Sequence, residues 1–176
     1  KTAADKIINY LHKKFPHIEI EALGSLRRQT KTVGDIDLAA KSTQTKDILD
    51  YFLTYPKNIQ TINRGPKKAS IRIYPDIRVD LMIQPSKNFY SLVQHFTGSK
   101  QHNILLRKYA LSLGLSISEY GIKDLKTGKI NTFTSEEKLY NFLKLCFIPP
   151  QNRTGTTEIE TAQKCYNQLL KIKSKK

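Results

Sequence analysis

Two aspartates one residue apart, Asp35 and Asp37, are the first side chains in this sequence that could carry chemistry. They lie in the stretch GSLRRQTKTVGDIDL, residues 24–38, whose end is typical of a β-strand. Side chains at positions i and i+2 of a strand point to the same face, so the two carboxylates project together while Ile36 and Leu38 point into the core. Ionised carboxylates this close repel each other, and a cation between them would relieve the repulsion.

A third carboxylate is expected from the later segment RVDLMI. Alternation there places Val79, Leu81 and Ile83 on the packing face and leaves Arg78 and Asp80 on the other. Asp80 is therefore the third candidate ligand, and no histidine or cysteine cluster accompanies the three aspartates in the sequence. Carboxylate oxygens suit Mg²⁺ and tolerate Mn²⁺. We expect a divalent-metal site at these three residues.

A candidate anion site comes just before the aspartates. Gly24 and Ser25 follow directly on a predicted strand, so their backbone N–H groups and the serine hydroxyl could approach an anion. Arg27 and Arg28 stand close by. An oligophosphate held by arginine, backbone donors and metal ions is the arrangement that nucleotidyl transfer requires, because that chemistry depends on positioning and charge neutralisation.

The elements that must position these residues in the first half are expected to form a mixed sheet backed by helices. In the first helix, Ala4, Ile8, Leu11 and Phe15 are expected to form the apolar stripe. Periodicity and turn residues predict helices at 3–15 and 44–55, strands at 17–24, 35–40 and 58–63, and a hairpin at 69–83 that turns at Pro75 and Asp76.

The second half is expected to be mainly helical with one small β-hairpin, which gives an α+β fold overall. A capping box is expected at Thr134 and Glu137. The pattern predicts helices at 88–96, from Ser99 onward and at 134–145, a hairpin at 115–133, a break at 147–152 and a final amphipathic stretch ending in KIKSKK. We place the division of the chain near residues 84–94 and assign 1–88 and 89–176 as its two parts.

The charge balance indicates a polyanionic partner. The 176 residues carry a formal net charge of +15. Residues 1–85 have 15 lysines and arginines against 9 acidic residues, and residues 86–176 have 15 against 6, so the second half is the more basic. Such a surface favours nucleic acid through phosphate neutralisation and counterion release, and a basic surface kept only for solubility is the alternative.

Other features of the sequence bound its class. No apolar run approaches the length of a membrane span, and the start of the chain is amphipathic, so we expect a cytoplasmic protein without a membrane partner. The chain opens on Lys1 in place of methionine, from which we expect a portion of a longer protein. Cys146 and Cys165 lack metal-ligand spacing, and we expect two separate thiols.

In their order, these motifs resemble the nucleotidyltransferase palm of family X DNA polymerases, the group that contains DNA polymerase beta. The pattern is G-S-x-R-R, then G-D-I-D, then a distant strand aspartate. The segments FTGSKQHN (96–103), SEYGI (118–122) and IPPQNRTGTTEIE (148–160) resemble the family's thumb, most closely in its bacterial branch. The resemblance runs from about residue 5 to about residue 160 and implies that 1–88 is the palm and 89–176 the thumb.

The resemblance also implies roles for single residues. Asp35 and Asp37 would bridge two Mg²⁺ ions, and Asp80 would bind only the catalytic one, near the primer 3′-hydroxyl. The triphosphate would be held by Ser25 and Arg28, with the turn at Gly24 and the backbone at Gly34. The remaining implied contacts are Phe96 and Gly98 at the sugar and base, Asn103 at the minor-groove edge of the incoming nucleotide, and Lys100 and Arg107 on DNA.

Three departures from the family pattern bear on function. The Tyr-Phe pair that often precedes T-G-S is here His95 and Phe96, and these two residues are our candidates for the sugar gate. Met82 stands two residues after Asp80, where the beta-type enzymes carry an arginine involved in opening and closing. Ser118 replaces the usual asparagine before Glu-Tyr. Only the palm and thumb are matched, and no segment here resembles the family's lyase, fingers or phosphoesterase domains.

The sequence thus predicts a metal-dependent, template-directed DNA polymerase of repair type. It would add nucleotides from dNTPs to a primer 3′ end in gapped DNA, with two Mg²⁺ ions and as a monomer. Two alternatives stay open. One is a nucleotidyltransferase of the same palm superfamily that acts on RNA ends, a small molecule or a protein. The other is a catalytically silent DNA-binding module, against which the intact carboxylate trio argues.

Overall fold

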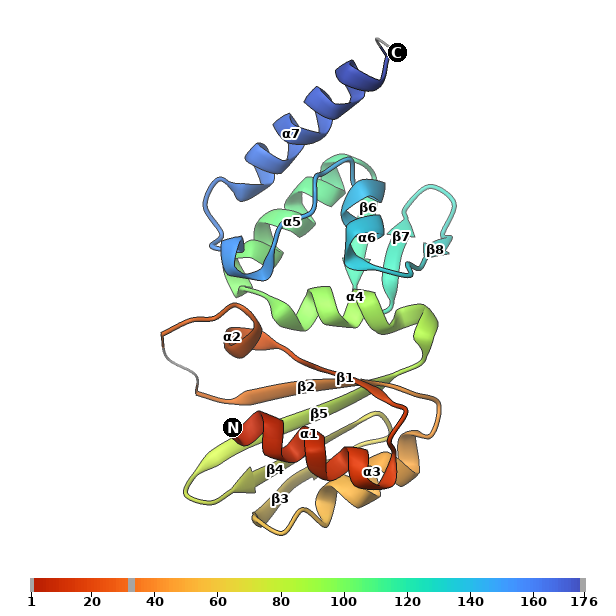
Figure 1. Cartoon of the computed structure of the whole chain (residues 1–176). Coiled ribbons are helices and arrows are strands. Elements are labelled where there is room, and N and C mark those ends of the chain that lie inside the picture. The colour runs from red at the N-terminus through yellow and green to blue at the C-terminus, as the bar shows by residue number, and fades with distance from the viewer. Residues whose placement is uncertain (1, 32–33, 175–176) are drawn as a thin grey trace. The chain divides into compact units, whose positions relative to one another are not determined.

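The computed structural model describes residues 2–31 and 34–174 of the chain. It divides into two compact units, Lys1–Phe89 and Tyr90–Lys176, which follow each other in the colour order of Figure 1. Helices and strands occur in both units, so the α+β fold class is confirmed. The assignment of the two parts as palm and thumb stays a prediction at this point.

A five-stranded sheet forms the centre of the first unit, as predicted. Its strands are β1 (Glu19–Ala22), β2 (Ile36–Lys41), β3 (Asn58–Arg64), β4 (Lys68–Ile73) and β5 (Ile77–Gln84), arranged in the order β1-β2-β5-β4-β3. Strands β2 and β5 are parallel, whereas the other neighbouring pairs are antiparallel. The sheet is therefore mixed, with the parallel pair at its middle.

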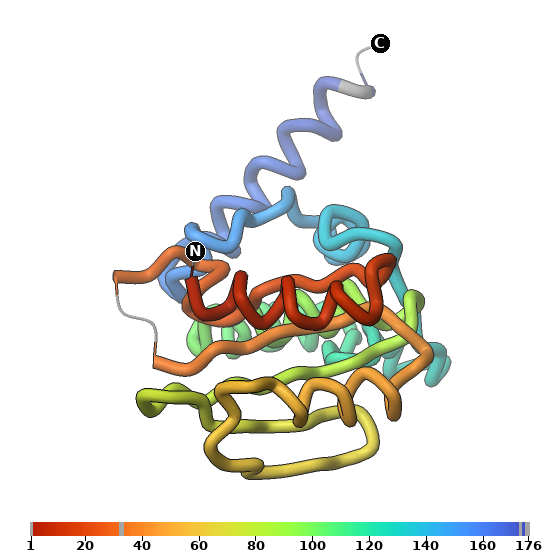
Figure 2. The backbone as a smooth tube through the Cα atoms, turned by 60° about the horizontal axis from the view of Figure 1, so that its bottom comes forward, coloured from red at the N-terminus to blue at the C-terminus, as the bar shows by residue number. Residues whose placement is uncertain are grey.

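Two helices cover one face of this sheet (Figures 1 and 2). Helix α1 (Ala3–Lys14) and helix α3 (Thr45–Leu53) bury their apolar stripes against the inward residues of the strands. The rings of Tyr10 and Tyr51 stack between the two helices with centroids 4.5 Å apart. The stripe of α1 differs slightly from the prediction, because Ile7 is fully buried and Ile8 only partly.

The second unit is built mainly from helices. Its helical segments are α4 (Ser86–Thr97), which begins in the first unit, α5 (Lys100–Ser112), α6 (Glu136–Phe142), a 3₁₀ turn (Pro150–Asn152) and α7 (Glu158–Lys173). Ser99 caps α5 as predicted, since its hydroxyl accepts a hydrogen bond from the His102 N–H.

The predicted cap of α6 is wrong by one residue. Ser135, not Thr134, is the N-cap, and its hydroxyl accepts from the N–H of Lys138. The Thr134 hydroxyl instead accepts from the Lys138 ammonium. Threonine and serine are both favourable N-cap residues, so residue type alone does not decide between Thr134 and Ser135. The choice depends on the path of the chain between β8 (Ile130–Asn131) and α6.

The predicted single hairpin is also incomplete, because the segment forms a three-stranded sheet of β6 (Leu115–Ser118), β7 (Gly121–Asp124) and β8 (Ile130–Asn131). The carboxylate of Asp124 accepts hydrogen bonds from the N–H groups of Lys126 and Thr127, which forms a second tight turn after β7. Gly121 has φ +143°, and a Cβ there would lie 2.5 Å from the Asn131 carbonyl oxygen. A glycine is therefore needed where β8 pairs with β7.

A disulfide joins Cys146 to Cys165, which corrects the prediction of two separate thiols. Cys146 lies in the loop after α6 and Cys165 on α7, with their Cα atoms 6.0 Å apart. The Cys146 N–H donates to the carbonyl of Ala162, one turn before Cys165 on the same helix face. Beyond this link α7 projects from the rest of its unit, leaving Leu169, Leu170 and Ile172 exposed (Figures 1 and 2).

Two buried polar groups accompany the core of the second unit. Arg153 is fully buried, and its guanidinium donates to Glu136 at 2.8 Å and to the Ile148 carbonyl at 3.0 Å. His102 lies between the Glu158 carboxylate at 2.8 Å and the Tyr140 hydroxyl at 2.9 Å.

Among the described residues, no helix is long and apolar enough to cross a membrane.

Removal of Glu136 should destabilise the second unit. Glu136→Ala would leave Arg153 buried without its carboxylate partner, at a cost of about 3 kcal/mol in the free energy of unfolding. Glu137→Ala is the matched control, because Glu137 also lies in the first turn of α6 but is exposed. Chemical denaturation of both variants measures the difference, and equal stabilities would contradict the role of the Glu136–Arg153 pair.

Candidate active site

The carboxylates of Asp37 and Asp80 lie on neighbouring strands at the middle of the first unit's sheet. In the parallel pairing of β2 and β5, Asp37 is directly opposite Asp80. Ile36 and Leu38 alternate with Asp37 and point into the core. Asp35 precedes β2 and is exposed. The structure thus places two of the three predicted ligands side by side and the third two residues away, while their roles remain predictions.

Positive side chains face Asp80 from two directions. The ammonium of Lys68 lies 2.6 Å from Oδ2, and Nε of Arg78 lies 3.0 Å from Oδ1. Burial opposes ionisation of Asp80, but the hydrogen bonds and positive charge of its partners outweigh it, so the pKa of this carboxyl is below its usual value. Asp80 is therefore a carboxylate at neutral pH.

Asp37 has the opposite shift. Burial and the negative charges of Asp80 and Asp35 raise the pKa of Asp37, and the charges of Lys68 and Arg78 offset this only in part. The face carries an excess of negative charge, which a bound cation would relieve. Within residues 2–31 and 34–174, however, no group of three or more acidic, histidine or cysteine side chains is already arranged around an ion position.

The turn before Asp35 contacts the aspartates through Gly24. Helix α2 (Gly24–Arg27) follows Leu23, whose N–H donates to the Asp37 carbonyl at 2.8 Å. Gly24 has φ +58°, and a Cβ at this position would lie 2.6 Å from Oδ2 of Asp37. Only glycine permits this approach. The short helix therefore brings the backbone of the predicted anion-binding residues against the carboxylates.

The other residues predicted to bind the triphosphate lie on either side of this turn. Ser25 is within α2 and Arg28 is its C-cap, and both are partly exposed. The Ser25 carbonyl accepts from the N–H and the hydroxyl of Thr30, which closes the turn. Gly34 is exposed and directly follows residues 32–33, which lie outside the described ranges.

In the second unit, two residues predicted to contact nucleotide and template are held by His95. The side-chain amide of Asn103 donates to the His95 carbonyl at 2.7 Å and accepts from Gln94 at 3.0 Å. Arg107 donates through Nη2 to Nδ1 of His95 at 3.1 Å. This arrangement requires an unprotonated Nδ1, so the neutral ring carries its proton on Nε2, which lies 3.8 Å from Glu119.

The electrostatics around His95 agree with a neutral ring. Burial and the adjacent Arg107 lower the pKa of His95, while Glu119 acts in the opposite direction. The ring of Phe96 lies beside that of His95, with centroids 4.8 Å apart. Gly98 is buried with φ +69° before the cap of α5, and Lys100 is exposed on the first turn of that helix.

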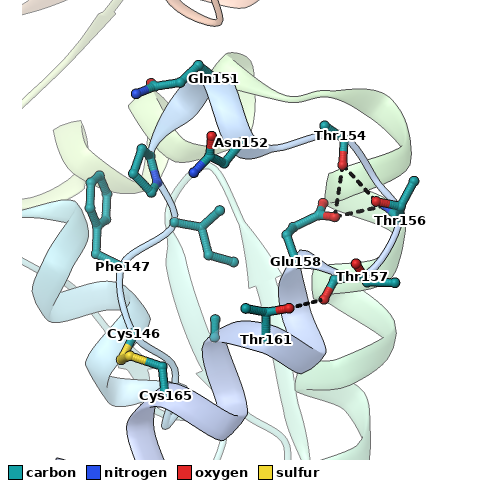
Figure 3. A pocket seen from close by; sticks show the side chains of 13 residues that line it. Cys146, Phe147, Gln151, Asn152, Thr154, Thr156, Thr157, Glu158, Thr161 and Cys165 are labelled. Atoms are coloured by element: carbon teal, nitrogen blue, oxygen red, sulfur yellow. Dashed lines mark hydrogen bonds between the residues drawn. A yellow bond between two sulfur atoms is a disulfide. The ribbon is translucent and has the colours of Figure 1, made fainter.

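A pocket of about 440 Å³ lies elsewhere in the second unit, beside the disulfide (Figure 3). Its wall is formed by the loop after α6 and the first turns of α7, and none of the predicted site residues lines it. Its threonine hydroxyls are used within the wall: Thr154 contacts Thr156 and Glu158, and Thr161 donates to the Thr157 carbonyl. The backbone N–H groups of Gly155 and Thr156 donate to the Glu158 carboxylate and, with His102, lower its pKa to about 2 despite burial. These bonds hold the loop to the helix.

The sequence analysis did not identify Lys68, Gln94 and Glu119, which contact the predicted site residues. A signal for Lys68 was present, because K-A-S-I-R-I places Lys68, Ser70 and Arg72 on the same face of the strand as Asp80 in the next strand. Gln94 and Glu119 carried no such signal, since their contacts depend on how the elements of the second unit pack.

A family model and a curated relative both match this chain. Residues 92–154, within the second unit, match the family described as DNA polymerase beta thumb. The protein named DNA polymerase/3'-5' exonuclease PolX, from Bacillus subtilis (strain 168), is 36% identical over 151 residues. This alignment covers 84% of the present chain but only 26% of that relative, so the chain spans about a quarter of the length of the curated relative it matches.

The alignment with PolX covers 84% of the chain and so extends beyond the thumb match into the first unit. These matches support a fragment similar to family X of the DNA polymerases, the family that contains DNA polymerase beta.

Proposed function

We propose that this chain carries the polymerase reaction of family X, adding nucleotides from dNTPs to a primer 3′ end opposite a template in gapped DNA. The reaction joins the primer 3′ oxygen to the α-phosphorus and releases pyrophosphate. The observation that supports it most is the placement of Asp37 beside Asp80 on the parallel strands, with the Gly24 turn against Asp37. The likeness to PolX and to the DNA polymerase beta thumb supports the same reaction, while DNA repair as its setting and an intracellular location are parts of the proposal.

The donor set fits the Mg²⁺ ions that we propose as cofactors, with Mn²⁺ as a substitute. Asp35, Asp37 and Asp80 offer only carboxylate oxygens, and the pKa of Asp37 is raised by burial and by the negative charges of Asp80 and Asp35, which a cation would neutralise. Asp35 and Asp37 would hold both ions, and Asp80 the catalytic one. When bound, these ions would neutralise phosphate charge and make the primer hydroxyl a better nucleophile.

The remaining residues bind and orient. The triphosphate would be held by Ser25, Arg28 and the backbone at Gly24 and Gly34. The N–H groups of a turn of small residues, together with an arginine, can donate hydrogen bonds to phosphate oxygens. In the second unit, the sugar and base would be contacted by Phe96, Gly98 and Asn103. The DNA would be contacted by Lys100 and Arg107. The protein would act on DNA as a monomer.

The carboxylate assignment can be tested with one substitution. Asp80→Asn should abolish primer extension on a gapped duplex with Mg²⁺ or Mn²⁺, because it removes a ligand oxygen and the carboxylate charge, and should leave DNA affinity nearly unchanged, because the side chain keeps its size. Asp76→Asn is the matched control, since Asp76 is exposed in the turn of the same hairpin. Extension of an unpaired single strand would favour the template-independent alternative. Full activity of Asp80→Asn would refute the assignment.

DNA binding should depend steeply on salt concentration, because the chain carries a net charge of +15 and binding releases counterions from the phosphates. Lys100→Ala should reduce the slope of log affinity against log salt by roughly one. Lys46→Ala is the control, because Lys46 already pairs with Asp50 at 3.0 Å. Fluorescence anisotropy over a salt series measures both slopes, and a flat dependence in the wild type would contradict the proposal.

The sugar gate can be tested at His95. His95→Tyr should raise the ratio of kcat/KM for deoxynucleotides to that for ribonucleotides by roughly a few-fold, because a larger ring beside Phe96 would hold the turn more rigidly against a 2′-hydroxyl. His17→Tyr, at an exposed position of the first unit, is the control. If the ratio does not change, the gate depends on Phe96 and the backbone around Gly98.

A further inference from the structure

Lys68 has a position that the proposed reaction does not explain. It is the first residue of β4, and its ammonium lies 2.6 Å from Oδ2 of Asp80 on the neighbouring strand. Arg78 contacts the other oxygen, Oδ1, at 3.0 Å. The side chain of Asp80 is only 11% exposed, so both of its oxygens are held by cationic donors in a confined space. Nη2 of Arg78 also reaches Oδ2, but at 3.5 Å, so a metal ion that binds Oδ2 would compete chiefly with the closer Lys68 ammonium.

The two cationic partners of Asp80 differ in how readily they could leave. Arg78 stands two residues before Asp80 on the same strand, so the strand itself keeps the two side chains together. Lys68 reaches diagonally from β4, where Ser70, not Lys68, is directly opposite Asp80. Its side chain is 37% exposed, and an ammonium on a flexible stem is readily hydrated. Lys68 can therefore exchange Asp80 for water, whereas Arg78, although its side chain is 41% exposed, starts beside Asp80 on the same strand and stays within reach of it.

Release of Lys68 from Asp80 would change the net charge beside the three aspartates. Asp35, Asp37 and Asp80 contribute three negative charges, against which Lys68 and Arg78 place two positive charges close by. With Lys68 in place, the attraction for a divalent cation is much smaller than the carboxylates alone would exert. When Lys68 turns into solvent, Oδ2 becomes available and the local negative charge increases.

We propose that Lys68 is an exchangeable counter-ion of Asp80, which occupies Oδ2 until a divalent cation displaces it and so weakens cation binding to the free protein. This inference rests on the proposed metal site, but it concerns a residue outside the ligand set. Lys68 pairs with a largely buried carboxylate, and without it Arg78 would be the one remaining cationic partner of Asp80 among the described residues.

The test measures Mn²⁺ binding to the intact chain without DNA or nucleotide, by electron paramagnetic resonance of free Mn²⁺. Lys68→Met should tighten binding about tenfold, because it frees Oδ2 and removes one positive charge beside the site. This gain should disappear in the double variant with Asp80→Asn. Lys68→Arg should bind Mn²⁺ as weakly as the wild type, and Lys57→Met should as well, since it removes the same charge from an exposed position of the same unit.

Thermal unfolding gives a second measurement. Lys68→Met should unfold at a lower temperature than the wild type without Mn²⁺ and should gain more from added Mn²⁺, because a ligand that binds the folded state more tightly stabilises it more. Lys68→Gln serves for both measurements if the methionine variant does not fold.

The outcomes separate this inference from the proposed function. If the wild type binds Mn²⁺ through Asp80 and the Lys68 variants bind it equally or more weakly, the counter-ion role is overturned and the metal site stands. If neither the wild type nor the Lys68 variants show binding that depends on Asp80, the metal assignment fails, and the counter-ion role fails with it.

Discussion

Asp37 and Asp80 meet on one face of the sheet, with Asp35 just before β2, and these carboxylates require positive charge beside them. The structure of the first unit depends on how this charge is distributed. Lys68 and Arg78 both contact Asp80, which lowers the pKa of that carboxyl, while Asp37 is left with burial and two negative neighbours and has a raised pKa. The same crowding explains Gly24, because the space that a side chain would need is filled by the Asp37 carboxylate. The turn, the strands and the counter-ions thus form one electrostatic unit.

The sequence was sufficient for the parts of this unit that depend on local alternation. In DIDLAA and RVDLMI the apolar residues must face the core, so the faces of Asp37 and Asp80 follow from a period of two. The parallel pairing of β2 with β5 was beyond such reasoning, because it joins segments some forty residues apart. The contact of Lys68 with Asp80 was missed although the hairpin predicted at 69–83 pairs β4 with β5, because that hairpin was placed to begin one residue after Lys68.

The errors in the second unit have similar causes. Thr134 and Ser135 are equally good caps by type, and the choice between them is made by the chain that enters α6. The link between Cys146 and Cys165 depends on the loop after α6 returning to α7, which no local pattern shows. Asn103 and Arg107, four residues apart on α5, could be placed on one helix face from their spacing, but that both would bond to His95 could not.

The parallel pairing of β2 with β5 also has a consequence for how the protein folds. Parallel neighbours cannot be joined by a tight turn, and here the connection runs through α3, β3 and β4 before the chain returns. The helices and the β4–β5 hairpin rely on local contacts and can form early, whereas the β2–β5 pair closes a long loop and belongs to the slow class of contacts. Asp37 and Asp80 meet only across that pair, so the two carboxylates come together only once the centre of the sheet has closed. A partly folded chain in which β2 and β5 are not yet paired therefore has no assembled carboxylate site.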